Sequence, residues 1–404
     1  MTADAPPDPR PGALVLGGLR RGALLVFLPV ALAAQAIAWV AAAISGAYTP
    51  MSWLKIGLAY ALASARVPFD VTTRGRGTLG AEGTPSTEVL AVALGALSIA
   101  LIVLAFRAGR SSAAAAGRRP GLAALAGGAV GLGVAALMVV AAVPVELAFP
   151  DADVTRLAPS LPFAFLLPLL LAGGVGAIGG LAAARDRLEE RPRGARGVAV
   201  VRGAGAMLAW GLILATAGVL LVAAVRPSAT AGYVRSVGEA GVGGAVVVVH
   251  HGLLLPNQSV MVWSAASGAP VRLAADDVTL VEVSLRGWDP SGLGADPVGL
   301  GFLTPLFLLV PVIATVLGGR LGGRRAHSVI QALGAGALAG VLYAALGVLT
   351  AWFASIRLPF LLLDDPTTLG PSLGRLAVVS VVWGVLGGAL GALSARRWPG
   401  RLSS

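Results

Sequence analysis

Long hydrophobic runs alternate with short polar segments along the whole chain. About 20 consecutive apolar residues are needed to cross the hydrocarbon core of a bilayer. Runs of this length predict transmembrane helices at 22–45, 88–106, 121–143, 161–184, 203–225, 298–319, 328–355 and 376–394, with polar loops at 69–87, 144–160 and 356–374. We therefore expect an all-α fold, a polytopic membrane helix bundle of about eight transmembrane helices with two re-entrant or interfacial dips.

The first dip is the apolar segment 50–68, which surrounds Lys55 with Trp53, Leu54 and Tyr60. It is too short and too charged for an ordinary span. Amphipathic helices of this kind lie in the membrane interface or enter the bilayer only partly. We therefore expect an interfacial or re-entrant helix here.

The second dip is the segment 241–268, which is long enough to enter a membrane but carries polar residues at its middle. These residues are His250, His251, Pro256, Asn257 and Gln258. An unpaired polar group in hydrocarbon costs several kcal/mol, and proline removes a helix hydrogen bond. We therefore expect a helix that breaks at Pro256 and returns to the same surface. A ninth full span kinked at this proline is the alternative.

Basic residues gather on one side of the predicted spans. The N-terminal tail, the connections 107–120, 185–202 and 320–327, and the C-terminal tail hold most of the arginines. The positive-inside rule assigns such segments to the cytoplasm. Lys55 is the single lysine, and this bias with abundant Ala and Gly is typical of a high-GC bacterial gene. We expect a bacterial plasma-membrane protein with both termini in the cytoplasm.

The two halves of the chain repeat the same order of elements. Arg21 and Arg202 each open a span within an Arg-Gly-Ala sequence, and the segment that ends near Pro68 aligns with the one that ends near Pro256. Each half contains a span, a dip and three further spans, as in a parallel internal repeat. The predicted organisation is a disordered tail 1–19, a first membrane repeat 20–188, a cytoplasmic linker 189–197, a second membrane repeat 198–396 with an external loop 269–297, and a basic tail 397–404. Within that loop, the β-branched stretch 278–285 is compatible with a short strand or hairpin.

Small residues recur at four-residue spacing in several spans. Such pairs let helix backbones approach closely, which drives helix association in lipid. The predicted packing glycines are Gly127, Gly131, Gly176, Gly180, Gly336, Gly340, Gly384 and Gly388.

Composition narrows the chemistry. Of 404 residues, 56% are hydrophobic and 12% are charged, against about 25% charged in soluble domains. Cysteine is absent, which excludes disulfides, iron–sulfur clusters and thiolate sites. The net charge of +11 comes from arginines beside the spans, so it indicates topology rather than nucleic-acid binding. No Walker A, HExxH or GxSxG motif occurs, and we expect neither enzymatic activity nor a cofactor.

The polar residues around Pro256 are the candidate functional residues. Adjacent residues lie about 100° apart on a helix, so His250 and His251 cannot both face one metal ion, and no metal site is expected. His250, His251, Asn257 and Gln258 either satisfy backbone groups near the proline or face a substrate. Acidic pairs in the outer loops either hold a cation weakly or are solvated; they are Asp276, Asp277, Asp364 and Asp365.

The sequence Leu255-Pro256-Asn257, with Trp263 downstream, carries a resemblance to a known family. The chain resembles the streptophobe family, highly hydrophobic polytopic membrane proteins of actinobacteria with no assigned activity. It is also similar to a related actinobacterial group with this element that is filed with cell-division membrane proteins. The resemblance implies a membrane bundle and supplies no catalytic residues.

Two functions fit the sequence. The first is a non-enzymatic scaffold of the cell envelope or of division, embedded in the lipid bilayer and binding membrane-protein partners or further copies of itself. The second is a passive or exchange-type small-molecule transporter whose site lies at the Pro68 and Pro256 dips. A polar, water-accessible cavity between the dips would favour transport, and a dry packed interior would favour the scaffold.

Overall fold

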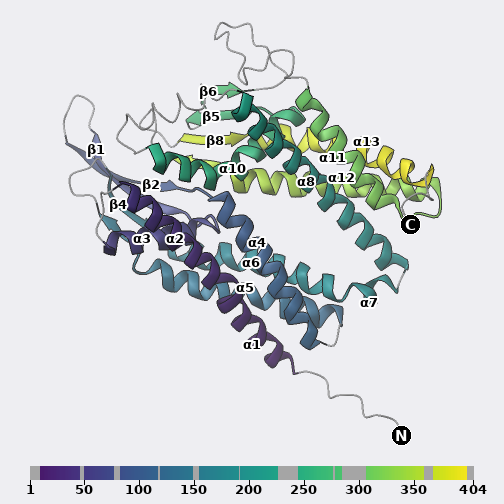
Figure 1. Ribbon diagram of the computed structural model, residues 1–404, viewed down its shortest axis with the longest axis horizontal. Helices are drawn as coiled ribbons and strands as arrows, with labels where there is room; N and C mark the ends of the chain where they lie inside the picture. The colour runs from purple at the N-terminus through teal and green to yellow at the C-terminus, as the bar shows by residue number, and fades with distance from the viewer. Residues whose placement is uncertain are drawn as a thin grey trace, which may run out of the picture. The chain divides into compact units, whose positions relative to one another are not determined.

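The computed structural model of the chain describes residues 10–45, 50–76, 82–116, 119–148, 154–190, 192–225, 244–275, 278–283, 306–358 and 367–397. The chain forms two compact units, Met1–Glu190 and Arg191–Ser404. Within each unit, long helices run side by side and a small sheet lies at one end of them (Figure 1).

The first unit begins with a long helix whose middle turn is wider than the rest. Its helices are α1 (Pro11–Arg21), the π-helix η1 (Gly22–Phe27), α2 (Leu28–Ser45), α3 (Pro50–Ala63), α4 (Gly95–Ser112), the 3-10 helix η2 (Ala113–Ala116), α5 (Pro120–Ala142), α6 (Leu161–Ala183) and α7 (Arg185–Glu189). Its strands are β1 (Phe69–Arg76), β2 (Glu82–Leu90), β3 (Leu147–Ala148) and β4 (Val154–Pro159).

The second unit has a similar order of elements. Its helices are α8 (Pro192–Val225), α10 (Gly244–Ser267), α11 (Leu309–Gly323), α12 (Val329–Ala354) and α13 (Leu373–Arg397). Its strands are β5 (Val271–Ala275), β6 (Val278–Val283), β7 (Ile356–Leu358) and β8 (Thr367–Pro371).

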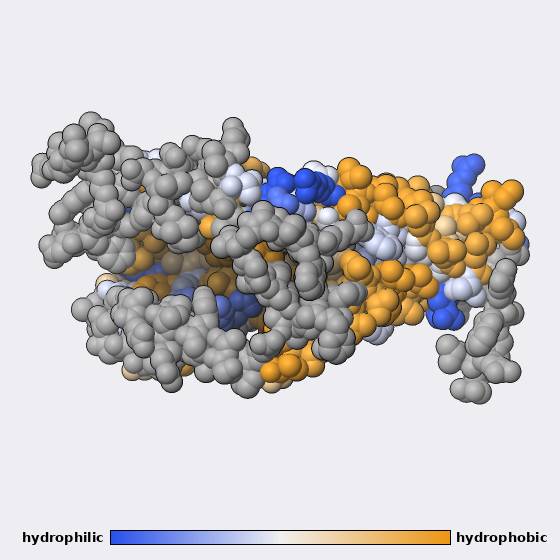
Figure 2. Space-filling model, turned by 90° about the horizontal axis from the view of Figure 1, so that it is seen from above, coloured by the Kyte–Doolittle hydropathy of each residue, from blue (hydrophilic) through white to orange (hydrophobic). Residues whose placement is uncertain are grey.

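Eight helices within the described ranges are long and apolar enough to cross a membrane. They span Pro11–Ala43, Gly95–Ser112, Pro120–Ala142, Leu161–Ala183, Arg193–Val225, Leu306–Gly323, Val329–Ala354 and Leu373–Ala395. Large apolar side chains are exposed along them, for example Leu32, Leu170, Leu338 and Leu386. Hydrophobic residues also form broad patches on the visible surface of the helices (Figure 2). Such surfaces suit lipid rather than water, and the chain is a membrane-embedded, multi-pass, all-α protein.

The two sheets share one topology. The strand orders are β2-β1-β4-β3 and β6-β5-β8-β7, with antiparallel pairing throughout. The central pair of each sheet joins segments that are far apart in sequence, since Phe69 pairs with Pro159 and Val271 pairs with Pro371. In the first sheet, Phe69 and Val71 are buried whereas Asp70 is exposed, which is the alternation of a sheet with one face on a core.

The strands were predicted only in part. The structure confirms a strand within 278–285, as β6. The expected loops 69–87, 144–160 and 356–374 instead contain strands in their described parts. These strands are short, several of them contain Thr, Gly and Pro, and the central pair of each sheet joins segments that are distant in sequence. Their local pattern therefore carries little signal.

Several predicted boundaries are wrong. The first helix begins at Pro11 rather than at 22, so the predicted tail 1–19 is helical from Pro11 onward. Leu14 is buried there, and a Cβ on Gly18 would lie 2.7 Å from the Cβ of Ala129 on α5, so packing extends the helix. The predicted linker 189–197 is largely the start of α8. Residues 88–90 of the expected second span belong to β2, and α4 starts at Gly95.

The wide turn η1 precedes a proline inside the first span. Pro29 lies two residues after η1, and the amide of Leu28 donates to the carbonyl of Ala23, five residues back. Proline has no N–H to donate, and its ring crowds the carbonyl four residues earlier. A π-type turn relieves this crowding while the helix continues.

The predicted packing glycines lie at close helix contacts. A Cβ on Gly127 would collide with the carbonyl oxygen of Gly176, and one on Gly131 would lie 2.5 Å from the Cα of Gly173. The same kind of contact joins Gly180 to Ala123. Helices α5 and α6 therefore approach each other through their backbones, as expected for small residues in lipid.

One glycine in each unit contacts two neighbouring helices. Gly176 of α6 lies against Gly109 of α4 and Gly127 of α5. In the second unit, Gly388 of α13 lies against Gly319 of α11 and Gly336 of α12, while Gly340 meets Gly384. We call these two sites the glycine junctions. They occupy corresponding helices of units that also share a sheet topology.

Candidate functional site

Helix α10 carries all of the polar residues singled out in segment 241–268. It is one continuous helix from Gly244 to Ser267 with Pro256 inside it, so the expected break at this proline is wrong. Proline removes a single backbone hydrogen bond. Packing retains the helix beyond this point, since Val260 and Trp263 are buried in the core of the second unit. The predicted start of the segment, 241–243, lies outside the described residues.

The second half of α10 nevertheless enters the bundle and leaves at the same end. The Asn257 side chain donates to the carbonyl of Ala354, the last residue of α12, at 3.0 Å. Trp263 packs against Gly347 of α12, which lies seven residues before Ala354. At 1.5 Å per residue, this contact is about 10 Å further into the bundle. The chain then returns to Val271, whose partner Pro371 lies beside the start of α13. The dip is thus formed by the C-terminal half of one continuous helix and the turn after it, without a break at Pro256.

The reversal occurs at Gly268, which has a φ of 99°. The amide of Ala269 donates to the carbonyl of Ser264 at 3.0 Å, and that of Gly268 donates to Ala265 at 3.0 Å. This pair of bonds is the Schellman arrangement, in which a left-handed residue ends a helix. Glycine suits the position because it has no Cβ to clash in this conformation.

The same turn ends α3 in the first unit, with Arg66 at the left-handed position. Arg66 has a φ of 57°, and Val67 donates to Leu62 at 3.2 Å. The next proline, Pro68, accepts from Ser160 at 2.9 Å, just as Pro270 accepts from Ser372 at 2.9 Å. Pro68 therefore corresponds to Pro270 in the structure, and the sequence alignment of Pro68 with Pro256 is wrong.

Arg66 is a buried cation that the sequence reading missed. Its residue is 8% exposed, and burial lowers the pKa of its guanidinium to about 10. The group therefore stays charged at neutral pH. A basic side chain at a helix C-terminus faces the negative end of the helix dipole, which offsets part of the cost of burial. The feature of the sequence that could have indicated this buried cation is a single arginine between an alanine-rich helix and a proline.

The candidate polar residues are partly brought together. The Gln258 side-chain nitrogen lies 2.8 Å from Nδ1 of His251, which is about two turns away on α10. Asn257 is buried and faces α12 instead. These contacts lie within the protein, and a substrate-facing role for His250, His251 or Gln258 stays a prediction.

A group of polar contacts that the sequence reading missed holds α10 in place. Trp263 is fully buried, donates to the hydroxyl of Tyr343 at 3.2 Å and packs edge-on against its ring. The hydroxyl of Thr216 on α8 donates to Ser259 at 2.9 Å. These groups bond to one another inside the second unit, as buried polar groups require. The available signal in the sequence was a tryptophan, Trp263, and a tyrosine, Tyr343, within segments that otherwise consist mainly of small and aliphatic residues.

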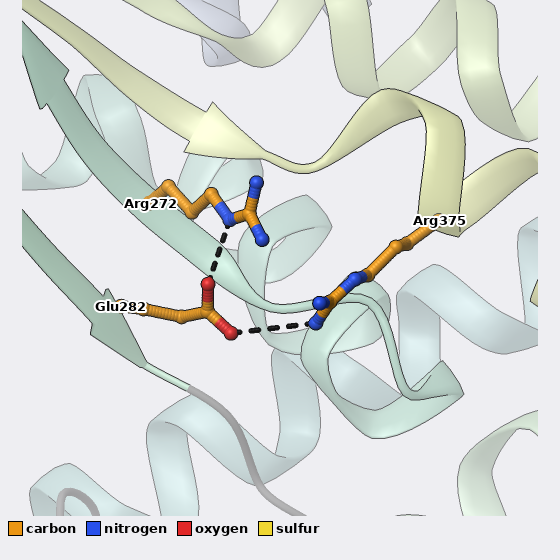
Figure 3. Close-up of polar contacts among 3 residues, drawn as sticks. All are labelled: Arg272, Glu282 and Arg375. Carbon is orange, nitrogen blue, oxygen red and sulfur yellow. Dashed lines mark hydrogen bonds and ion pairs between the residues drawn. The ribbon is translucent and has the colours of Figure 1, made fainter. Parts of the chain in front are cut away.

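The outward face of the second sheet carries an ion-paired cluster (Figure 3). Glu282 of β6 accepts from Nε of Arg272 on β5 at 2.8 Å and from Arg375 on α13 at 3.4 Å. The side chains are 32% to 60% exposed, so solvent screens these pairs. Glu282 also offsets the unfavourable placement of Arg375 near the positive end of a helix.

The outward face of the first sheet is hollowed into a groove of about 390 Å³. Its polar walls come from Asp70 and Thr72 of β1, Thr87 of β2 and Arg156 of β4, and Ser160 closes it at the start of α6. Arg156 is paired with Glu146 at 2.8 Å. We call this hollow the sheet groove.

Within the described residues, no group of three or more His, Cys, Asp or Glu side chains is placed to hold a metal ion. The acidic pairs Asp276–Asp277 and Asp364–Asp365 lie outside the described residues. Comparison with protein families, with curated proteins and with solved structures finds no match for the chain.

Proposed function

We propose that the protein is a non-enzymatic scaffold of the bacterial plasma membrane, associated with the cell envelope or with division, with both termini in the cytoplasm. The observation that carries this proposal is the use of polar groups inside the second unit. Asn257, Trp263 and Ser259, which lie on the inserted part of α10, bond to neighbouring helices. Polar side chains that bond to neighbouring helices stabilise the bundle, and they do not offer those bonds to a substrate.

The sheets then supply the surface for partners. They place charged side chains at one end of each unit, beyond apolar helices packed through the glycine junctions. In the proposed topology this end lies outside the cytoplasm, because the arginine-rich connections lie at the other ends of the spans. Duplicated units would present two such sheets, and this internal repeat is part of the proposal.

Photo-crosslinking in living cells tests the scaffold. A photoreactive residue at Glu282, on the outward sheet face, should yield discrete adducts with other proteins. The control position is Leu338, which is 61% exposed on the apolar surface of α12 and should yield only lipid adducts. Equal adduct patterns at the two positions would contradict the proposal.

Transport is the second candidate, and the entry of α10 into the bundle favours it. A helix end that enters and returns resembles the discontinuous helices that form transporter sites. Arg66, buried at the corresponding turn of α3, would then attract an anion. Proteoliposomes containing the purified protein should in that case show uptake of anions that is lost in Arg66→Gln. Uptake equal to that of empty liposomes excludes this function.

A further inference from the structure

The sheet groove combines opposite charges with an apolar rim. The carboxylate of Asp70 lies on β1 and the guanidinium of Arg156 on β4, and both line the hollow. Asp70 pairs in register with Ala158, two residues from Arg156, so the two charged residues are diagonal neighbours. Diagonal neighbours on adjacent strands lie about 7–8 Å apart. A small zwitterion with an ammonium group and an anion separated by two carbons can bridge such a distance.

The positive side of the groove is reinforced by a helix terminus. Ser160, Leu161 and Pro162 line the groove, and they are the N-cap and first two residues of the 23-residue helix α6, so its N-terminal end faces the groove. The Ser160 side chain makes no capping hydrogen bond there. Helix N-termini carry partial positive charge and favour anions such as phosphate. Arg156 donates its Nε to Glu146, which leaves its terminal guanidinium nitrogens to face an anion. Together with these nitrogens, the wall suits a phosphate.

The negative side has no internal partner among the described residues. Asp70 is exposed, and none of those residues bonds to its carboxylate. In the second sheet the corresponding position is Arg272, which is ion-paired with Glu282. The first sheet thus presents an acceptor for a ligand ammonium where the second sheet has a salt bridge.

The apolar rim indicates where the ligand comes from. Leu161, Phe163 and Leu166 at the start of α6 are 47%, 45% and 45% exposed, and α6 is one of the helices able to cross the membrane. The groove therefore lies where a polar sheet meets a lipid-facing helix. A volume of about 390 Å³ accommodates a lipid head group, while acyl chains would extend along α6.

From these features we infer that the sheet groove binds the head group of a phospholipid that carries a phosphate and a primary ammonium, as in phosphatidylethanolamine. The phosphate lies between Arg156 and the N-terminus of α6. The ammonium donates hydrogen bonds to Asp70. A choline head group keeps the charge but has no N–H to donate, and a glycerol head group has no cation.

Native mass spectrometry of the full-length protein in mild detergent tests this assignment. The protein is mixed with equal amounts of lipids carrying ethanolamine, choline or glycerol head groups. The ethanolamine lipid should be retained preferentially, and Asp70→Asn should lower its ratio to the glycerol lipid about tenfold, as expected for loss of one charge-assisted hydrogen bond. Asp70→Glu should keep most of the preference.

The matched control is Asp186→Asn, the same change at an exposed aspartate on α7, which should leave lipid selection unchanged. Soluble phosphoethanolamine is added in a separate arm. Retention of all three lipids alike, or an equal loss in Asp186→Asn, overturns the proposal. Binding of soluble phosphoethanolamine as tight as that of the lipid shows a soluble zwitterion to be the ligand and also overturns it.

Discussion

Replacing Gly176 with alanine tests the glycine junction of the first unit. A Cβ at this position would collide with the carbonyl oxygen of Gly127 and lie 3.3 Å from the Cβ of Val130. Both contacts are with α5, which must move away from α6 to make room. Since Gly109 of α4 also packs against Gly176, the movement would loosen a contact among three helices.

The matched control is Gly174→Ala in the same helix, where nothing lies within 4 Å of the added Cβ. Both substitutions gain the same helix propensity, up to about 1 kcal/mol. Overpacking in a tight interior typically costs about 1–3 kcal/mol. The propensity gain cancels, and we therefore expect Gly176→Ala to be about 1–3 kcal/mol less stable than Gly174→Ala.

Unfolding of the purified protein in detergent micelles, followed by circular dichroism against increasing dodecyl sulfate, measures this difference. The second unit offers an independent pair, since Gly336 lies against Gly388 whereas Gly334 has open space around its Cβ position. Equal stability of Gly176→Ala and Gly174→Ala would refute close backbone packing at the junction.

Three further predictions concern the dip and the topology. Gly268→Ala should lower the free energy of unfolding by about 1 kcal/mol in the same assay, because the φ of Gly268 is 99°. Gly268→Asn should lower it less, since asparagine tolerates this conformation. Equal losses in the two variants would argue against a conformational cause. Asn257→Leu should lower stability by about 1–2 kcal/mol through loss of its bond to Ala354, and a neutral result would contradict that contact. A cysteine at Ala275 should react with a membrane-impermeant maleimide in intact cells and one at Ser111 should not; the reverse pattern would invert the proposed topology.

The spans could be predicted from sequence because each is a local property. A run of about 20 apolar residues must be helical in lipid wherever it lies in the chain. The glycine contacts were predictable for a similar reason, since spacing of four residues puts Gly127 and Gly131 on one helix face. The ends of helices were less predictable, because burial of Leu14 against another helix extends α1 beyond its hydrophobic run.

The sheets and the exact turn of the dip depend on distant partners. Asp70 and Arg156 are 86 positions apart in sequence and meet only because β1 pairs with β4. Pro256 looked like a break because proline lowers local helix stability, but tertiary contacts of Trp263 and Asn257 hold the helix together. The chain reverses instead at Gly268, where the left-handed conformation is inexpensive.

The pairing of β1 with β4 sets an order of events during synthesis. The strand at 69–76 has its central partner at 154–159, so it must wait until both intervening helices, α4 and α5, have been made and inserted. Closure of sheets between distant segments is slow relative to helix formation. Because β4 precedes residue 191, the first unit contains every strand of its own sheet before the second unit leaves the ribosome. A translocation error in α4 or α5 would leave this edge of β1 without its partner strand.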